Sequence, residues 1–243
     1  MPRLFVEHAL ADADPELILP PGAARHVQVL RLQPGSTLTL FDGSGRDWPA
    51  EVLRMARSEV VVRLGEPVQV GRELPQAVTL AVVMPANDRM DGIVEKATEL
   101  GVAGIQPLMS ERSVLRLSGD RAEKKLAHWR GVAIAACEQC GRSRVPEIAP
   151  VQSLAQWLGG LPADAGAQRR WLLSPTAAEP IATRAQASGE ATLVLSGPEG
   201  GLSASEEDLA RARGFGAVQL GPRILRADTA PLAVLGWLAL SNA

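Results

Sequence analysis

Cysteine and histidine are scarce in this chain of 243 residues. The two cysteines, Cys137 and Cys140, form the sequence CEQC, and the three histidines are His8, His26 and His128. Tetrahedral zinc would need two ligands besides the cysteines, and a redox pair usually follows a strand at a helix N-terminus, whereas CEQC lies late in a helical pattern. We therefore expect no metal and interpret both cysteines as buried helical thiols.

The common nucleotide-binding motifs are also missing. Gly43 to Gly45 are not followed by a third glycine, since position 48 is Trp48, and no helical pattern comes after them. No GxxxxGK(S/T) sequence occurs, so the chain has no P-loop to cradle phosphates. Chemistry driven by ATP or by a dinucleotide therefore lacks its best sequence signal.

No apolar run is long enough to span a bilayer, because the longest, near Ala230 to Leu240, is too short. Met1-Pro2-Arg3 does not begin a secretory signal pattern. The hydrophobic content of 46% is ample for a packed core. We expect a globular cytoplasmic enzyme that does not contact a membrane, built as one large domain or two modest ones.

The chain has no large excess of positive or negative charge, since its formal net charge is -2. Its distribution is uneven, however, because the stretch from Arg112 to Arg144 holds eight Lys or Arg against Asp120, Glu123 and Glu138. Such a cluster can neutralise phosphates, and arginine adds bidentate geometry. A solvated helix face is the alternative interpretation.

The first 72 residues show short alternating patterns separated by glycine turns. Several short strands of this kind predict a small β-barrel. The predicted strands are Thr37 to Phe41, Trp48 to Leu53 and Val60 to Leu64. The sequence GEPVQVGRELPQ that follows is polar and marked by glycine and proline, which is typical of an interdomain linker.

After the linker, apolar strand patterns alternate with helical ones, which predicts βαβ units around a parallel sheet. The expected strands are Val78 to Val83, Ile105 to Leu108 and Arg170 to Ser174. The expected helices run from a cap at Asn87 or Asp88 to Gly101, from Arg121 to Arg142, and from a capping box at Ser203 and Glu206 to Gly214. Surface connections are expected at Gly159 to Gly166 and Ala177 to Gly189.

Two further apolar runs, Ala191 to Leu195 and Ala217 to Leu220, each stop at a Gly-Pro pair. Ligands of open α/β sheets bind beyond the carboxyl ends of the strands, so both loops lie where a small-molecule site is expected. The first loop, SGPEGGLS, is rich in glycine, which lets the backbone approach a ligand closely. Two ordinary tight turns are the alternative.

The last helical pattern, near Thr229 to Leu240, is apolar around nearly its whole circumference. A helix of this kind must be buried, and a terminal one often achieves this against a second subunit. We therefore expect a homodimer.

The loops GPEGGLS and LGPRILRADTAPL, together with DRMDGIVEKATELGV, PLMSERSV and AIAACEQCGRSRVPEI, closely resemble the ribosomal RNA small subunit methyltransferase E family. This family is part of the SPOUT class of knotted methyltransferases. The resemblance covers most of the chain from about Val78 onward. It implies an α/β fold with a PUA-like β-barrel RNA-binding domain over residues 1-72, and a SPOUT methyltransferase domain with a trefoil knot over residues 73-243.

The resemblance also implies an activity and its partners. Family members transfer a methyl group from S-adenosylmethionine to N3 of one uridine in 16S ribosomal RNA of the small subunit. They act as homodimers in which the partner chain completes each site. A methyltransferase of the same fold acting on transfer RNA or another base, and a non-catalytic RNA-binding protein, are the alternatives.

The family's motifs carry over to named residues of this chain. Catalytic candidates are Arg226, Asp228, Glu138 and Arg142. Expected RNA-binding residues are Arg25, His26, Arg31, Arg112, Lys124, Lys125 and Arg142. Expected cofactor-binding residues are Leu172, Leu173, Ser174, Ser196, Gly197, Pro198, Glu199, Gly200, Gly201, Leu220, Gly221, Arg223, Ile224, Leu225 and Arg226. The late motif departs from the family pattern R-T-E-T, since it reads Arg226-Ala227-Asp228-Thr229 here, so we favour Arg226 over Asp228 as the catalytic side chain.

Overall fold

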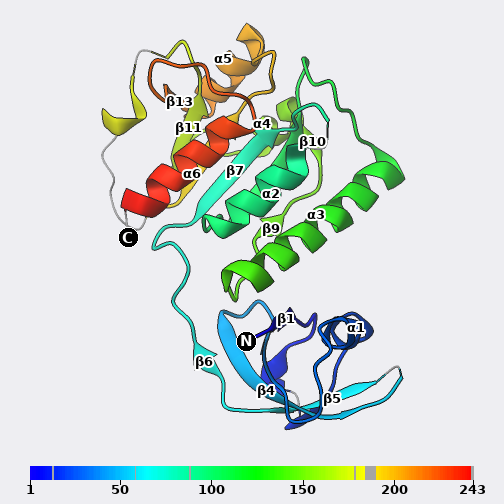
Figure 1. Cartoon of the computed structure of the whole chain (residues 1–243). Coiled ribbons are helices and arrows are strands. Elements are labelled where there is room, and N and C mark those ends of the chain that lie inside the picture. Colours follow the sequence, from blue (N-terminus) through cyan, green and yellow to red (C-terminus); the bar gives the residue numbers. More distant parts are fainter. Residues whose placement is uncertain (13, 58, 88, 178, 184–189, 242–243) are drawn as a thin grey trace. The chain divides into compact units, whose positions relative to one another are not determined.

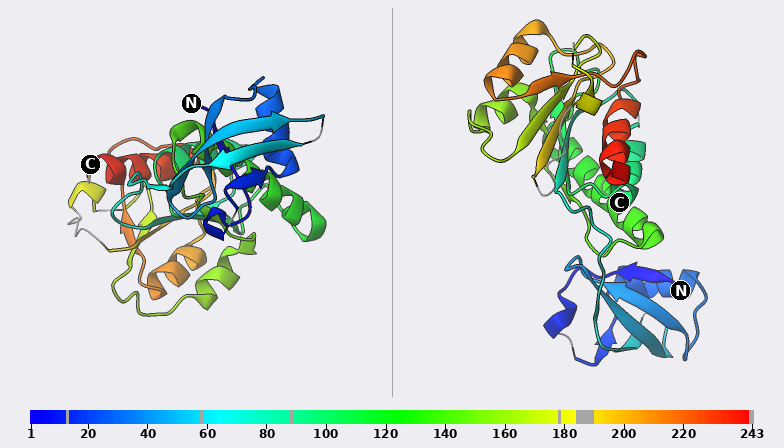
Figure 2. Two further views of the ribbon diagram at one scale, coloured as in Figure 1. Left: turned by 90° about the horizontal axis from the view of Figure 1, so that it is seen from below. Right: turned by 90° about the vertical axis from the view of Figure 1, so that its left-hand side faces the viewer.

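The computed structural model describes residues 1–12, 14–57, 59–87, 89–177, 179–183 and 190–241. The chain forms two compact units, drawn in Figures 1 and 2. Unit 1 combines Met1–Glu73 with Ile134–Val145, and unit 2 combines Leu74–Ala133 with Pro146–Ala243. The domain boundary predicted from the sequence places all of residues 73-243 in the second domain, whereas residues 134–145 pack with unit 1.

Unit 1 is built on one six-stranded sheet with the order β1-β3-β4-β5-β2 and with β6 paired to β4. Only the β1–β3 pair is parallel. Inward-facing side chains of the strands, such as Leu38, Leu40, Val60 and Val62, form a hydrophobic core. The strands are β1 (Arg3–Phe5), β2 (Glu16–Ile18), β3 (Thr37–Phe41), β4 (Arg46–Met55), β5 (Val60–Leu64) and β6 (Val68–Gln69). The three predicted strands are therefore present, and β6 lies inside the predicted linker.

One helix of unit 1, α1 (Pro21–Val29), was not predicted. It begins with proline, whose missing N–H costs nothing at the first helical position. Its buried side chains, Ala23, Ala24 and Val27, recur at helical spacing. Two of the three are alanines, so the apolar stripe was too weak a signal to distinguish from the strand patterns around it. A short 3-10 turn, Leu10–Asp12, precedes it.

The end of helix α3 (Gly119–Cys140) and the loop after it are fastened within unit 1 by polar contacts. The Phe5 N–H donates to Glu138 Oε1 at 3.0 Å. Arg142 is only 3% exposed and forms an ion pair with Glu73. Arg3 donates to both oxygens of Asp47, at 2.5 and 2.9 Å, and the Ser143 hydroxyl donates to the same carboxylate. Together, these charge-assisted contacts fix the loop after α3 to the sheet of unit 1.

We expect the variant Asp47→Asn to lower the free energy of unfolding at pH 7 by about 1–3 kcal/mol, because the hydrogen bonds from Arg3 and Ser143 lose a charged acceptor. Burial opposes ionisation of Asp47, but these bonds outweigh it and lower the pKa below the ordinary 3.8. The stabilisation is therefore present above pH 3.8 and is lost as the pH falls through the lower pKa of the folded state. Urea titrations of both proteins from pH 7 to pH 2 measure this, and a difference that stays constant to pH 2 would contradict the assignment.

Unit 2 is built around a seven-stranded sheet with the order β10-β8-β7-β12-β11-β13, with β9 paired to β8. All of its pairs are parallel, which confirms the predicted βαβ architecture. The strands are β7 (Val78–Val83), β8 (Gly104–Met109), β9 (Glu147–Ile148), β10 (Gln152–Ser153), β11 (Arg169–Leu173), β12 (Thr192–Ser196) and β13 (Gly216–Val218). The helices are α2 (Arg89–Glu99), α3, α4 (Leu154–Gly160), α5 (Ala204–Ala212) and α6 (Thr229–Ser241), with a 3-10 turn at Ile181–Thr183.

Helices cover both faces of this sheet, with α2 and α6 on one side and α4 and α5 on the other (Figures 1 and 2). Along β7, Ala81 and Val83 pack in the cluster that includes α4 and α5, and the alternate residues Leu80 and Val82 are also fully buried. A strand buried on both faces has a continuous apolar sequence, which is why β7 was predicted with its observed bounds. The capping box at the start of α5 is also confirmed.

Two expectations fall partly outside the described residues. Asp88, one of the two proposed caps of α2, and residues 178 and 184–189 of the expected connection Ala177 to Gly189 are among the residues not described. Cys137 is buried and Cys140 is half-buried; burial raises the pKa of the Cys137 thiol to about 12. Within the described ranges, no helix has the length and apolarity to cross a membrane, and no three metal-ligating side chains gather as a group.

Candidate functional site

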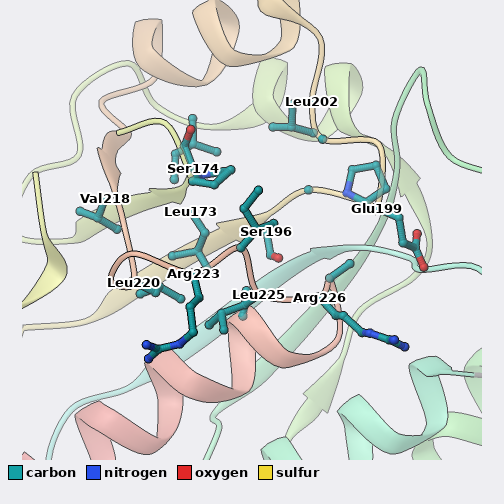
Figure 3. Close-up of a pocket in the computed structure, with 18 of the residues that line it drawn as sticks. Leu173, Ser174, Ser196, Glu199, Leu202, Val218, Leu220, Arg223, Leu225 and Arg226 are labelled. Atoms are coloured by element: carbon teal, nitrogen blue, oxygen red, sulfur yellow. The ribbon is translucent and has the colours of Figure 1, made fainter. Parts of the chain in front are cut away.

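A cavity of about 580 Å³ lies in unit 2 at the carboxyl ends of three neighbouring strands, β11, β12 and β13. Figure 3 shows side chains from all three strand ends and from the loops that follow them around this space. Parallel strands bring these ends to one edge of the sheet, where ligands of α/β proteins bind. The volume falls within the range of small-molecule sites.

The cavity gathers nearly all of the predicted cofactor-binding residues. Fourteen of the fifteen line it, from Leu172 in β11 to Arg226 in the last loop. Gly200 does not line it; a side chain there would contact Arg112 instead, at 3.6 Å. Residues that also line the cavity but were not predicted are Arg89, Pro175, Leu202, Glu207, Val218, Ala227 and Ala230.

The first loop follows Ser196, the buried last residue of β12. The Gly201 N–H donates to the Pro198 carbonyl at 2.9 Å, which closes a turn, and Gly201 has a φ of 68° that favours glycine. At Gly197 a Cβ would meet Leu202 at 3.2 Å, so a larger residue there would require Leu202 to shift. The sequence pattern SGPEGGLS thus produces a tight loop whose backbone faces the cavity.

The second loop runs from the end of β13 to the start of α6. Gly221 has a φ of 89°, again a conformation that favours glycine. The Arg226 carbonyl accepts hydrogen bonds from the N–H groups of Thr229 and Ala230, both at 3.0 Å, which fixes the start of α6 directly after the loop. The Ser174 N–H donates to the Val218 carbonyl at 3.0 Å and so joins the ends of β11 and β13.

Two arginines of the second loop are exposed at the cavity. The side chains of Arg223 and Arg226 extend in different directions from the loop (Figure 3). Neither forms an ion pair within the part of the chain that the structure describes. Exposed guanidinium groups at a cavity are available for an anionic ligand or for charge that develops on one.

Carboxylates of both loops lie near a third arginine at the start of α2. Glu199 Oε1 accepts a hydrogen bond from the Ala86 N–H at 3.1 Å and lies 3.6 Å from Arg89 Nη1. On the second loop, Asp228 Oδ2 lies 3.9 Å from Arg89 Nε. Of the predicted catalytic residues, Arg226 lines the cavity, whereas Asp228 does not and is linked to it through Arg89.

The other two catalytic candidates, Glu138 and Arg142, lie in unit 1 and already have partners there. Glu138 accepts from the Phe5 N–H and its Oε2 lies 3.7 Å from His26 Nδ1, whereas Arg142 is buried against Glu73. A buried guanidinium paired in this way has a structural role, so we assign Arg142 neither a catalytic nor an RNA-binding function.

The remaining RNA-binding candidates are spread over both units. Arg25 and Arg31 are exposed on unit 1, and Lys124 is exposed on α3 in unit 2, with Lys125 half-buried beside it. Arg112 donates from Nη1 to the carbonyls of Gly200, at 2.7 Å, and Leu202, at 3.3 Å. It therefore supports the first loop of the cavity, a contact that its position in a basic stretch did not indicate.

Two family models match the chain, one described as an RNA methyltransferase domain over residues 72–239 and one as an RNA methyltransferase PUA domain over residues 19–65. Together with the cavity, they define an RNA methyltransferase with a PUA domain. Among curated proteins, ribosomal RNA small subunit methyltransferase E of Synechocystis sp. is 37% identical over 87% of this chain and 68% of that protein. The Bacillus subtilis protein of the same name is 32% identical over 88% of this chain and 85% of its own length. The chain belongs to the ribosomal RNA small subunit methyltransferase E family.

Solved structures agree with this assignment. A crystal structure of ribosomal RNA small subunit methyltransferase E from Neisseria gonorrhoeae bound to S-adenosyl methionine has a TM-score of 0.90 at 35% identity, over 99% of this chain and 98% of that one. A methyltransferase from Legionella pneumophila in complex with the same cofactor has a TM-score of 0.89 at 32% identity, over 98% and 97%.

Proposed function

We propose that this protein transfers a methyl group from S-adenosylmethionine to N3 of one uridine in the 16S ribosomal RNA of the small subunit. The observation that carries the proposal is the cavity between the two Gly-Pro loops, because a non-catalytic RNA-binding protein would not need two glycine-rich loops at strand ends. The family membership supports the ribosomal substrate over transfer RNA.

The cavity residues fit S-adenosylmethionine. Backbone groups of the two loops and of Leu172 to Ser174 would hold it, and the apolar side chains of Leu173, Leu220 and Leu225 offer surface for its base and carbon chain. The volume of about 580 Å³ suits a ligand of this size. When bound, S-adenosylmethionine supplies an activated methyl group on a sulfonium.

The protein must then align the uracil and manage its charge. Uracil N3 carries a proton that has to leave before the nitrogen can attack, and negative charge then spreads to the flanking carbonyl oxygens. We assign the guanidinium of Arg226 the role of stabilising that charge, since a preorganised donor is most effective in a cavity that excludes water. Asp228 and Glu138 are the candidates for the base.

We further propose the family's trefoil knot for the region from β11 to α6, and a homodimer. The apolar helix α6 supports the dimer, because Leu240 at its end is 81% exposed in the single chain and would be covered by a partner.

Arg25 and Arg31, both exposed on unit 1, are proposed to neutralise RNA phosphates. We expect the double variant Arg25→Ala/Arg31→Ala to bind small-subunit RNA about fivefold to tenfold more weakly and to reduce the slope of log affinity against log salt by about 1 to 2. The matched control is Arg54→Ala/Arg63→Ala, since both of these arginines are exposed on the same unit but lie 3.9 Å from Glu16. Filter binding across a salt series tests this, and equal losses in both double variants would contradict a specific role.

The proposed function is tested by mapping modified nucleotides. Purified protein and labelled S-adenosylmethionine are incubated with small subunits from cells that lack the enzyme, and the 16S RNA is digested and analysed. We expect one N3-methyluridine. Methylation of transfer RNA alone, or of a different base, would replace the substrate assignment, and donor binding without any transfer would contradict the catalytic proposal.

A further inference from the structure

Arg89 is the first residue of helix α2 and lines the cavity, although it belongs to neither of the two Gly-Pro loops. Its side chain is only about one-third exposed. Its guanidinium lies 3.6 Å from the Glu199 carboxylate on the first loop and 3.9 Å from the Asp228 carboxylate on the second loop.

The contact with the first loop has two parts. Glu199 Oε1 lies 3.6 Å from Arg89 Nη1 and accepts the Ala86 N–H at 3.1 Å, so this carboxylate is held by both the side chain and the backbone at the entrance to α2. Negative charge is also favourable near a helix N-terminus. The first loop is therefore anchored to α2 at Glu199, the residue between Pro198 and Gly200.

The second loop depends on Arg89 more strongly than the first, because among the described residues Asp228 accepts no backbone hydrogen bond like the one from Ala86 to Glu199. Asp228 Oδ2 lies 3.9 Å from Arg89 Nε, and the other oxygen, Oδ1, is 3.4 Å from the Thr229 hydroxyl. Without Arg89, the two carboxylates would lose the guanidinium that lies 3.6 Å from Glu199 and 3.9 Å from Asp228. The attraction that ties both loops to the start of α2 would then be absent, and each loop would be less restrained.

A single exposed ion pair contributes little to stability. The arrangement here differs, because one guanidinium lies near carboxylates of two separate loops, and each loop contains a glycine with positive φ. The expected consequence is local: the loops lose order while the rest of unit 2 remains folded.

We propose that Arg89 is a positioning residue that fastens both cavity loops through a Glu199–Arg89–Asp228 bridge and thereby keeps the cavity shaped for the methyl donor. The importance of the bridge for donor binding rests on the proposed function. The bridge itself is a property of the free protein.

The first test measures the free protein. Hydrogen exchange followed by mass spectrometry is compared for the unmodified protein, Arg89→Met, Arg89→Lys and Lys96→Met. Lys96 is the matched control, since it lies on the same helix and pairs with Glu95 and Glu99, both at 2.8 Å, away from the loops.

We expect Arg89→Met to speed exchange about threefold to tenfold in peptides covering residues 197–202 and 221–228. Arg89→Lys should restore part of the protection, because a compact ammonium can pair with only one carboxylate well at a time. Lys96→Met should leave both loops unchanged. Unchanged exchange in either loop of Arg89→Met would overturn the bridge, as would equal effects of Lys96→Met.

The second test is a double-mutant cycle on donor affinity, measured by calorimetry with S-adenosylmethionine. We expect Arg89→Met and Asp228→Asn each to weaken binding about threefold to tenfold, and the double variant to be no weaker than the worse single one, because both remove the same contact. Losses that multiply would overturn the coupling. If the unmodified protein binds no donor, the proposed function fails, whereas the exchange experiment still decides the bridge.

Discussion

Replacing Arg226 by alanine is expected to lower the single-turnover rate of methyl transfer about 10²- to 10³-fold while changing donor affinity little, since loss of one preorganised charge-stabilising donor typically costs this much. The reason is the position of its guanidinium, exposed at the cavity and without an ion-pair partner in the described part of the chain. The rate is measured with saturating donor and small subunits, and affinity is measured separately by calorimetry.

The control for this prediction is Arg211→Ala. Arg211 is an exposed arginine of the same unit, but it pairs with Glu207 at 2.6 Å and Asp208 at 3.0 Å on α5. A transfer rate for Arg226→Ala within twofold of that control would exclude the guanidinium role. A large loss of donor affinity with an unchanged rate would instead make Arg226 a donor-binding residue.

The same rate measurements, repeated across pH, separate the two candidate bases. If Asp228 takes the N3 proton, Asp228→Asn should be nearly inactive at neutral pH and partly recover as the pH rises, because solvent then removes the proton more easily. If Asp228 acts only through Arg89, the Asp228→Asn variant should lose little of the transfer rate at any pH. That outcome would leave Glu138, whose Oε1 already accepts the Phe5 N–H in unit 1.

The sequence predicts this site well wherever the signal is local. A fully buried parallel strand needs a continuous apolar run, and glycine with proline ends it, so β7, β12 and the first cavity loop follow from short segments. Fourteen of the fifteen residues that the family motifs give for the cofactor then line the cavity. The motif DRMDGIVEKATELGV contains Arg89 but does not indicate its contacts, because these depend on carboxylates that the fold brings to it from far along the chain.

The same limit explains which contacts of unit 1 the sequence does not predict. The pattern from Arg121 to Arg142 indicates one helix, and nothing in its periodicity shows that its last turns pack with a different unit from its first ones. The reason lies in long-range pairs, such as Arg142 with Glu73 and Ser143 with Asp47. From the sequence alone, a basic residue such as Arg142 in a charged stretch is predicted to bind phosphate, because its partner Glu73 is distant in the sequence.

Backbone shape in the two cavity loops provides the other large expected effect. Gly201 and Gly221 both line the cavity and have φ values of 68° and 89°, where an L side chain is strained. We expect Gly201→Ala/Gly221→Ala to weaken S-adenosylmethionine binding about 100-fold, because each free loop would relax away from a conformation that costs an alanine about 1–2 kcal/mol, and donor binding would have to restore it.

The chain provides a matched control at the neighbouring position, Gly200→Ala. Gly200 does not line the cavity and is not among the glycines with positive φ, and an added Cβ would make only ordinary contact with Arg112, at 3.6 Å. Donor affinity is measured by calorimetry, and thermal unfolding is measured in parallel to confirm that each variant is folded. If the loops bind the donor through their backbones, affinity falls in the double variant and stays within about threefold of the parent in Gly200→Ala. Equal affinity in all three proteins would mean that the donor does not rely on the backbone shape at Gly201 and Gly221.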